Sequence, residues 1–539
     1  MAGLLACVAI CIGTYARAAD SAPPFPSFQE LEAQGATIGT IRIDPQNIFD
    51  LGDPRENGTF FQVANALHIR TREEVIRGGL LFKPGERVSA RLIDETERLF
   101  RTHHFFYDVT IRPAAYHDGV VDIDVVTRDT WTLDVTGKVS RSGGANTTAF
   151  GIKDENFLGT ATALGFTQVS DPDRHGWEFE VSYPRAFDGW TKLAYIQGHF
   201  NDGNLKTATI LRPFYALDTR WAAGATGLDQ DRIDSIYNAG DVVSKYRHRV
   251  KSGEAFGGWS RGSIDGWTQR YSLGVTAQDD SYELAPDETA PAPFPVNHKV
   301  RGPFLRYEVV EDQFVRMRNR DQIARTEFVS MGFNLTMQVT QSIESWGASQ
   351  SSWLYSAKVE NGFPFRWGHD LHASFVAERS IDSTGHPLDH EGALLRYFAP
   401  QTTNAAFYGS ISGDRIGTAA APDLLELGGD TGLRGYPLRY QAGEHRALLT
   451  LEQRLYTDWY PFRLIRVGGA VFYDVGRAWS GVNQNTVNGG WLNDVGVGLR
   501  LALDRTAFAN VLHLDVAVPL NRTSEIKSVQ WLVKTQLTF

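Results

Sequence analysis

The last eleven residues of the chain, 529–539, alternate between two faces and end on an aromatic residue. Odd-numbered positions carry a mostly apolar face and even-numbered positions a polar face, with Leu532 as the exception. A side-chain period of two is typical of a β-strand that places one face against an apolar medium. A strand of about ten residues with an aromatic at its end is what a transmembrane β-barrel requires. We therefore predict that Trp531, Leu537 and Phe539 form an assembly signal at the end of such a barrel.

Composition narrows the class of protein further. Lys and Arg number 53 against 63 Asp and Glu, a net charge of −10, so a nucleic-acid partner is excluded by repulsion from phosphates. No apolar run approaches the roughly 20 residues of a spanning helix. Membrane spans must then be strands, and strands survive in lipid only as a closed barrel. The 52 glycines and the recurring turn clusters fit many strands after about residue 131.

Residues 1–18 are predicted to be an export signal. An apolar core, Leu4–Ile12, precedes a small-x-small cleavage site, so the mature chain would begin near Ala19. Both cysteines, Cys7 and Cys11, lie inside this signal. Cleavage at Cys7 as a lipoprotein is the alternative, but no apolar core precedes that residue. The mature chain would contain no thiolate, and we predict no metal and no cofactor.

A segment with a different periodicity, 36–130, follows a short linker, 19–35. Its pattern predicts strand, helix, helix, strand, strand. Thr71-Arg72-Glu73-Glu74 is a capping box that would open the first helix, and the second is expected from Ser89 to Thr102. Asp118-Gly119 is expected to join the last two strands in a hairpin. We predict a small α+β domain here.

Three motifs stand in the remaining part of the chain, 131–539. Leu433-Arg434-Gly435-Tyr436 follows a Gly-rich approach, Asp154–Gly159 reads Asp-Glu-Asn-Phe-Leu-Gly, and Phe472–Trp479 reads Phe-Tyr-Asp-Val-Gly-Arg-Ala-Trp. Together they resemble the Val/Leu-Arg-Gly-Phe/Tyr signature and flanking segments of the BamA and TamA assembly-factor superfamily, which includes the two-partner secretion exporters. The α+β segment before them resembles that superfamily's polypeptide-transport-associated (POTRA) domain.

This resemblance implies a mainly β fold. It predicts a 16-stranded transmembrane antiparallel barrel over 131–539, in the outer membrane of a Gram-negative bacterium, preceded by one periplasmic POTRA domain. The 409 residues from 131 to 539 then give roughly 26 per strand. Segmentation by alternation finds nearer twenty runs, and we interpret those at Trp353–Glu360 and His369–Glu378 as hairpin extensions outside the membrane. The connections Asp279–Lys299 and 412–446 are expected to be extracellular loops.

Alternation in the strands after the signature indicates what it contacts. Glu452 and Asp474 both fall on polar faces and are expected to point into the lumen. The resemblance implies that loop 412–446 tucks inside the barrel, where the guanidinium of Arg434 can satisfy both carboxylates. Gly435 would allow close backbone approach, and Tyr436 would pack on the lumenal wall. Bracing of the barrel alone is an alternative role for this cluster.

Enzymatic patterns are scarce. Ser260 lies in a Gly-x-Ser-x-Gly match, but that nucleophile motif needs a strand-turn-helix context and here it falls among alternating strands. His103 and His104 end a helix, where a cationic ring would suit the carbonyl end, and the pair alone offers too few ligands for a metal. We predict that the protein is not an enzyme.

The leading hypothesis for function is insertion of proteins into the outer membrane or translocation of polypeptides across it. A POTRA strand edge would add an extended client strand, and the seam between strands near 131–140 and 529–539 would open to template another. Expected partners are client outer-membrane or secreted polypeptides, outer-membrane lipid and periplasmic accessory proteins. The alternatives are an exporter of one dedicated partner, although such exporters typically carry two POTRA domains, and a passive porin. Lipid is an alternative cargo to protein.

Overall fold

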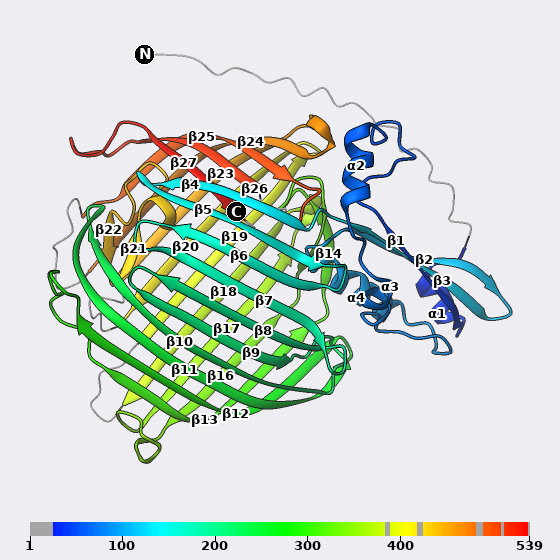
Figure 1. Ribbon diagram of the computed structural model, residues 1–539, viewed down its shortest axis with the longest axis horizontal. Coiled ribbons are helices and arrows are strands. Elements are labelled where there is room, and N and C mark those ends of the chain that lie inside the picture. The colour runs from blue at the N-terminus through cyan, green and yellow to red at the C-terminus, as the bar shows by residue number, and fades with distance from the viewer. Residues whose placement is uncertain (1–24, 383–388, 418–423, 481–488, 508–510, 537–539) are drawn as a thin grey trace.

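A computed structural model describes residues 25–382, 389–417, 424–480, 489–507 and 511–536. Within these residues the chain forms a small N-terminal α+β region and a closed antiparallel barrel (Figure 1). The predicted export signal, with its cleavage site before Ala19, lies outside the described residues, as do Leu537 and Phe539.

The N-terminal region is built on a three-stranded sheet in the order β1-β3-β2, with β1 parallel and β2 antiparallel to the central strand. Four helices accompany the sheet. Ile76, Ile93 and Phe100 from the helices pack on Val109 and Ile123 of the sheet to form the core. The elements are α1 (Phe28–Ala33), β1 (Thr37–Gln46), α2 (Thr59–Leu67), α3 (Glu73–Arg77), α4 (Ala90–Arg101), β2 (Phe106–His117) and β3 (Val120–Asp129).

Local expectations for this region hold in part. Asp118 and Gly119 both have positive φ, 52° and 76°, as the predicted hairpin turn requires. The helix expected from Ser89 to Thr102 is α4, in which Ser89 and Thr102 are the capping residues. The predicted capping box is wrong: α3 begins one residue after Arg72 without a side-chain cap, because the Thr71 hydroxyl donates to buried Asp129 at 3.0 Å instead. The helix α2 was not expected.

The barrel contains twenty strands among the described residues, and the prediction of sixteen is wrong. The runs interpreted as hairpin extensions, Trp353–Glu360 and His369–Glu378, lie within β17 and β18, which pair along their full length as members of the wall. The alternation pattern had indicated about twenty runs, and only the resemblance had imposed the lower number. With twenty strands, 409 residues give about 20 per strand and connection.

The barrel closes in the order β4 to β13, β16 to β20 and β23 to β27, with β27 returning to β4. Its strands are β4 (Leu133–Ser142), β5 (Ala145–Phe157), β6 (Thr162–Ser170), β7 (His175–Ala186), β8 (Thr191–Phe200), β9 (Gly203–Arg212), β10 (Trp221–Asn238), β11 (Asp241–Ile264), β12 (Trp267–Leu284), β13 (His298–Glu311), β16 (Asn334–Ser342), β17 (Ser352–Pro364), β18 (Asp370–Asp382), β19 (Asp389–Thr402), β20 (Ala405–Ile416), β23 (His445–Tyr456), β24 (Ile465–Trp479), β25 (Leu492–Leu503), β26 (Val511–Pro519) and β27 (Gln530–Gln536).

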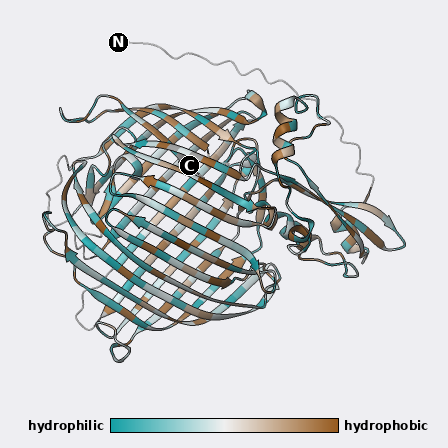
Figure 2. Ribbon diagram, viewed as in Figure 1, coloured by the Kyte–Doolittle hydropathy of each residue, from teal (hydrophilic) through white to brown (hydrophobic). Residues whose placement is uncertain are grey.

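The wall has an apolar outer face and a polar inner face. In β12, Leu273 and Val275 on the outer face are exposed, whereas Ser272 on the inner face is buried. In β27, Trp531 faces outward and Leu532, the exception in the sequence pattern, is buried inside. Apolar and polar residues alternate along the strands in Figure 2. An outer face of this kind suits contact with lipid. None of the helices in the described residues is long and apolar enough to cross a membrane.

The N-terminal region docks on one end of the barrel, which we call the proximal end; the opposite end is the distal end (Figure 1). The backbone N–H of Arg72 donates to the Gly159 carbonyl at 3.0 Å. Glu95 of α4 accepts from the backbone N–H of Leu217 at 2.7 Å. The turn holding Gly159 is the Asp154–Gly159 motif, so this motif forms part of the docking surface for the N-terminal region.

Candidate functional site

The connection between β20 and β23 enters the lumen from the distal end and carries the signature. It includes β21 (Leu425–Leu427), a short helical turn η4 (Gly429–Thr431) and β22 (Gln441–Gly443). Leu433 and Tyr436 are fully buried. They pack in a cluster with Leu427, Tyr440, Ala478, Leu492 and Ile526. The signature part of this connection therefore packs against the inner wall near β24 and β25.

Arg434 lies at the centre of a group of carboxylates. Its Nε and Nη2 donate to both oxygens of Asp474 at 2.7 and 2.9 Å, and its Nη1 donates to Glu452 at 2.7 Å. Asp515 of β26 is 3.4 Å away, and the guanidinium carbon lies 3.4 Å from the centre of the Phe472 ring. The side chains of Arg434, Glu452 and Asp474 are only 12%, 4% and 2% exposed. The cluster is a buried, charge-assisted clamp rather than a surface ion pair.

Gly435 and Tyr436 fix the loop backbone against β25. The Gly435 N–H donates to Asp494 at 3.0 Å, and a Cβ at Gly435 would lie 2.7 Å from the Asp494 Cβ. The Tyr436 hydroxyl lies 3.0 Å from the Asn493 carbonyl and 3.1 Å from that of Asn521. Because a side chain at Gly435 would collide with the wall, glycine is needed for this close approach.

A second insert enters the lumen from the proximal end. The connection between β13 and β16 forms a hairpin, β14 (Phe314–Arg318) and β15 (Thr326–Ser330), outside the barrel sheet. We call the connection 312–333 the proximal plug. Its tip residue Ile323 is buried among lumen-facing residues of five strands. These are Phe398, Ala406, Tyr408, Tyr456, Ala502 and Val511.

The proximal plug also contacts the N-terminal region. Arg316 pairs with Glu97 of α4 at 2.8 Å, and Arg325 donates to the Phe106 carbonyl at 2.9 Å. The guanidinium of Arg98 stacks on the Phe314 ring at 3.7 Å. A movement of the N-terminal region would therefore shift or break its contacts with the proximal plug.

Polar contacts connect the two inserts across the lumen. Glu452, which binds Arg434, also accepts from Arg454 Nε at 3.0 Å. The Nη1 of Arg454 donates to the carbonyl of Arg320 in the proximal plug at 3.0 Å, and Arg320 pairs with Asp370 at 2.7 Å. The distal loop and the proximal plug thus share one buried network.

Among the described residues, few paired positions join the first and last strands of the barrel. Within the described residues β27 pairs with β4 at one position, Val533 opposite Arg141, whereas it pairs with β26 at seven and β4 pairs with β5 at ten. The signature loop spans this seam. Leu438 N–H donates to the Gly143 carbonyl of the β4–β5 turn at 3.0 Å, and Lys534 of β27 donates to the Asp430 carbonyl at 3.3 Å.

The residues weighed for enzymatic or metal chemistry serve structural roles. Ser260 lies within β11, and its hydroxyl donates to the Gln269 carbonyl at 2.7 Å. Burial, with the Arg185 guanidinium nearby, lowers the pKa of His103 to about 4, so its ring is neutral and the expected cation at the helix end is absent. No group of three or more metal-ligating side chains occurs in the described part of the chain.

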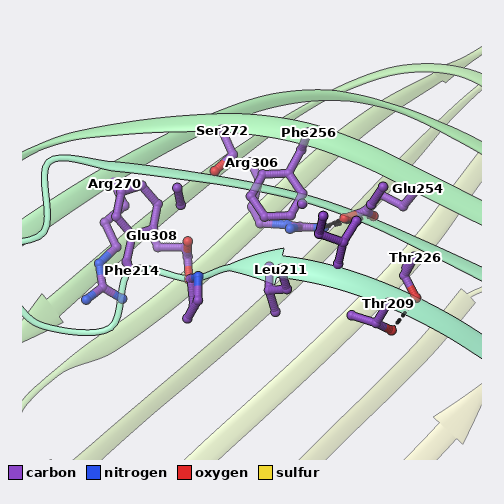
Figure 3. A pocket seen from close by; sticks show the side chains of 15 residues that line it. Thr209, Leu211, Phe214, Thr226, Glu254, Phe256, Arg270, Ser272, Arg306 and Glu308 are labelled. Atoms are coloured by element: carbon purple, nitrogen blue, oxygen red, sulfur yellow. Dashed lines mark hydrogen bonds and ion pairs between the residues drawn. The ribbon is translucent and has the colours of Figure 1, made fainter. Parts of the chain in front are cut away.

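A cavity of about 370 Å³ opens on the inner wall between β9 and β13, as Figure 3 shows. Arg306 crosses it to Glu254 at 2.9 Å and donates from Nε to Gln338 at 2.8 Å. Phe214 and Phe256 form apolar sides of the cavity. Arg306 is thus paired to a carboxylate, and Arg270, the other arginine that lines the cavity, donates to the Ala216 carbonyl at 3.4 Å, so this part of the wall is braced internally.

Sequence reasoning did not assign several residues to the buried network. Arg454 shares the polar face of Glu452, so alternation already places it inward, and Asp515 falls on the inward parity of β26 by the same signal. Arg320 had none, because it lies in a connection that only the fold brings into the lumen.

No protein-family profile matches the sequence, and no curated protein matches it. Among solved structures, BamA from Haemophilus ducreyi lacking POTRA domains 1–3 is 13% identical, with a TM-score of 0.38 over 92% of this chain and 84% of that one. CdiB from Escherichia coli is 12% identical, with a TM-score of 0.48 over 93% and 76%. OccK10 from Pseudomonas aeruginosa is 12% identical, with a TM-score of 0.32 over 74% and 98%. The chain is thus only distantly similar to each of these three proteins.

Proposed function

We propose that this protein inserts or translocates polypeptides at the outer membrane of a Gram-negative bacterium, as a member of the BamA and TamA superfamily. The observation that carries the proposal is the seam, where one paired position joins the described residues of β4 and β27. We take the other backbone N–H and C=O groups on this edge of β4 to be open to an incoming strand. A client strand added there gains main-chain hydrogen bonds whatever its sequence.

Several features support this mechanism. The N-terminal region, taken as a POTRA domain of residues 36–130 in the periplasm, has β2 as an edge strand of its sheet for receiving a client, whereas the start of the other edge strand, β1, already pairs with residues 85–88. The barrel then spans 131–539, and its loop 412–446 enters from the extracellular side. Burial of client strands in lipid drives insertion, so no cofactor is required.

The signature clamp has a defined role in this proposal. Since its loop contacts both Gly143 beside β4 and Lys534 on β27, Arg434 holds together the two sides of the seam. Release of the clamp frees the seam, and the C-terminal residues Trp531, Leu537 and Phe539 guide its reclosure. Outer-membrane lipid and periplasmic accessory proteins are further proposed partners.

A disulfide across the seam tests the proposal. Arg141→Cys with Val533→Cys places thiols at the paired position, and Val497→Cys with Val516→Cys is a matched control between β25 and β26. The full-length protein is placed in phosphatidylcholine vesicles and given an unfolded eight-stranded outer-membrane barrel as client. We expect oxidation to slow client folding only for the seam pair, with recovery on reduction. If the client folds as fast with the seam disulfide fully formed as without it, the proposal is overturned.

Export through the lumen and passive diffusion require a different opening. Both inserts, the signature loop and the proximal plug, would have to leave the lumen. A protein that conducts ions steadily in planar bilayers with the seam oxidised would favour the porin alternative, and release of one dedicated substrate under the same lock would favour the exporter.

A further inference from the structure

The helix α2, Thr59–Leu67, buries a polar side chain and exposes apolar ones. Its one buried side chain is polar: Asn65 donates to the Phe49 carbonyl at 2.8 Å and accepts from the Phe49 N–H at 3.1 Å. Phe61 packs on the buried Phe49 ring at 4.8 Å, but Phe60, Val63 and Leu67 face outward and are exposed by 58%, 51% and 69%. Positions i, i+3 and i+7 share one face of a helix, so these three form a continuous apolar stripe.

Charge is absent from this part of the chain. The thirteen residues between Glu56 and Arg70 include no Asp, Glu, Lys or Arg, and Ile69 just beyond the helix is also exposed. The helix appears brown in Figure 2. A helix of this composition gains nothing from water on its outer face, so the surface requires an apolar partner.

Ion pairs hold α2 at the rim of the barrel. Arg505, in the β25–β26 turn, pairs with Glu56 at 2.8 Å and donates to the Ile48 carbonyl at 3.1 Å. Arg463, in the β23–β24 turn, lies 3.6 Å from the same carboxylate. Figure 1 shows α2 beside the proximal ends of these strands. Its depth relative to the barrel is therefore fixed.

The turn that holds Arg463 also exposes aromatic rings. Trp459 is 66% and Phe462 is 77% exposed. Aromatic side chains at the end of a membrane strand mark the interface between acyl chains and headgroups. Through Glu56, the segment that leads into α2 is thus anchored to a turn whose own rings belong at that interface.

We propose that α2 is a lipid-binding foot: Phe60, Val63 and Leu67, together with Trp459 and Phe462, insert into the proximal leaflet of the membrane. Its partner is the boundary between acyl chains and headgroups of an uncharged lipid, because the stripe of α2 carries no charge and Arg463, which follows Phe462, already lies beside Glu56 and Asp53. The foot stands at the base of the seam, since the Arg505 carbonyl accepts from Trp131, two residues before β4, at 2.7 Å. The proposal goes beyond polypeptide insertion and holds whether or not the seam opens.

Fluorescence quenching by brominated lipid tests the foot. Single cysteines are introduced as Val63→Cys or Leu67→Cys in the full-length protein, with Cys7 and Cys11 changed to Ser, and labelled with bimane. A matched control, Ala33→Cys, lies on the exposed side of α1 in the same N-terminal region. The protein is placed in vesicles of phosphatidylcholine with or without brominated acyl chains. We expect brominated lipid to quench the labels on α2 and to leave the α1 label bright.

A second variant separates lipid contact from mere proximity. A label at Ala66→Cys reports on the helix when Phe60, Val63 and Leu67 are all changed to Ser, and we expect its quenching to be lost while heat-modifiable migration shows a folded barrel. Labels on α2 that stay as bright as the control would overturn the proposal. So would quenching that survives the triple change, or label environments that depend on protein density, which would indicate a second copy of the chain as the partner.

Discussion

Replacement of Arg434 by Ala gives the sharpest test of the buried clamp. Glu452 keeps Arg454 as a partner at 3.0 Å, and Asp515 keeps Arg500. Asp474, however, has no other cation within ion-pair distance among the described residues, and it is only 2% exposed. One carboxylate is therefore stranded in a dry site, which costs roughly 3 to 5 kcal/mol.

This cost appears as opening of the signature loop rather than as unfolding of the barrel. At a factor of ten for every 1.4 kcal/mol, the backbone amides of the loop are expected to exchange hydrogen roughly 10² to 10⁴ times faster in Arg434→Ala. Mass spectrometry on the full-length protein in vesicles measures this on peptides covering 425–443. Client insertion is expected to fall while migration on a gel still shows a folded barrel.

Two further variants identify the cause. Arg439→Ala changes another arginine of the same loop, which also pairs with two carboxylates but is 23% exposed, so its cost is expected to be roughly 0 to 1 kcal/mol. Adding Asp474→Ala to Arg434→Ala removes the stranded charge, and the two losses are expected not to add. Exchange in Arg434→Ala no faster than in Arg439→Ala, or cleanly additive losses, would refute the reasoning.

Three other perturbations have defined outcomes. Ile323→Ala removes the buried tip of the proximal plug at a cost of roughly 2 to 5 kcal/mol, and we expect larger ion conductance in planar bilayers, whereas unchanged conductance would show that the plug does not close the lumen. Burial, with Asp321 nearby, raises the pKa of Glu327 in the plug from 4.5 to about 7. Docking of the plug in the lumen is therefore strongest below pH 4.5 and weakens as the pH rises to about 7. Ion conductance is expected to rise across this window in the natural protein and to stay flat in Glu327→Gln. Deletion of Phe539 is expected to slow assembly of the protein far more than deletion of the distal-loop residue Ala290. Equal assembly rates for the two deletions would show that the last strand does not carry the assembly signal.

Much of the site could be predicted from the sequence because parity in a strand is a local property. Alternation alone placed Glu452 and Asp474 on the inner face of β23 and β24, and both lie against Arg434. Asp515 lies on the inner face by the same rule, but its approach to Arg434 depends on the order and stagger of β25 and β26. Such register is set by pairing between distant segments, which a single sequence does not display.

The strand number and the inserts could not be predicted in the same way. Nothing in a strand's own pattern says whether it lies inside or outside the membrane, so β17 and β18 were misplaced. The proximal plug has no long apolar run, because Ile323 alone enters the lumenal cluster. Helix α2 was missed because its buried position is Asn65, which reverses the usual relation between polarity and burial.

The place of the proximal plug in the barrel has a mechanical consequence. It hangs from the connection between the tenth and eleventh strands, β13 and β16, which lie across the barrel from the seam between the twentieth and the first. Its tip rests on the half of the wall that leads to β27. If a client strand is added at the seam, as we propose, the circumference lengthens and that half of the wall moves away from the plug's hinge. Because the plug has a fixed length, Ile323 would lose its contacts in the lumenal cluster as the barrel widens. The lumen would then open when the wall does.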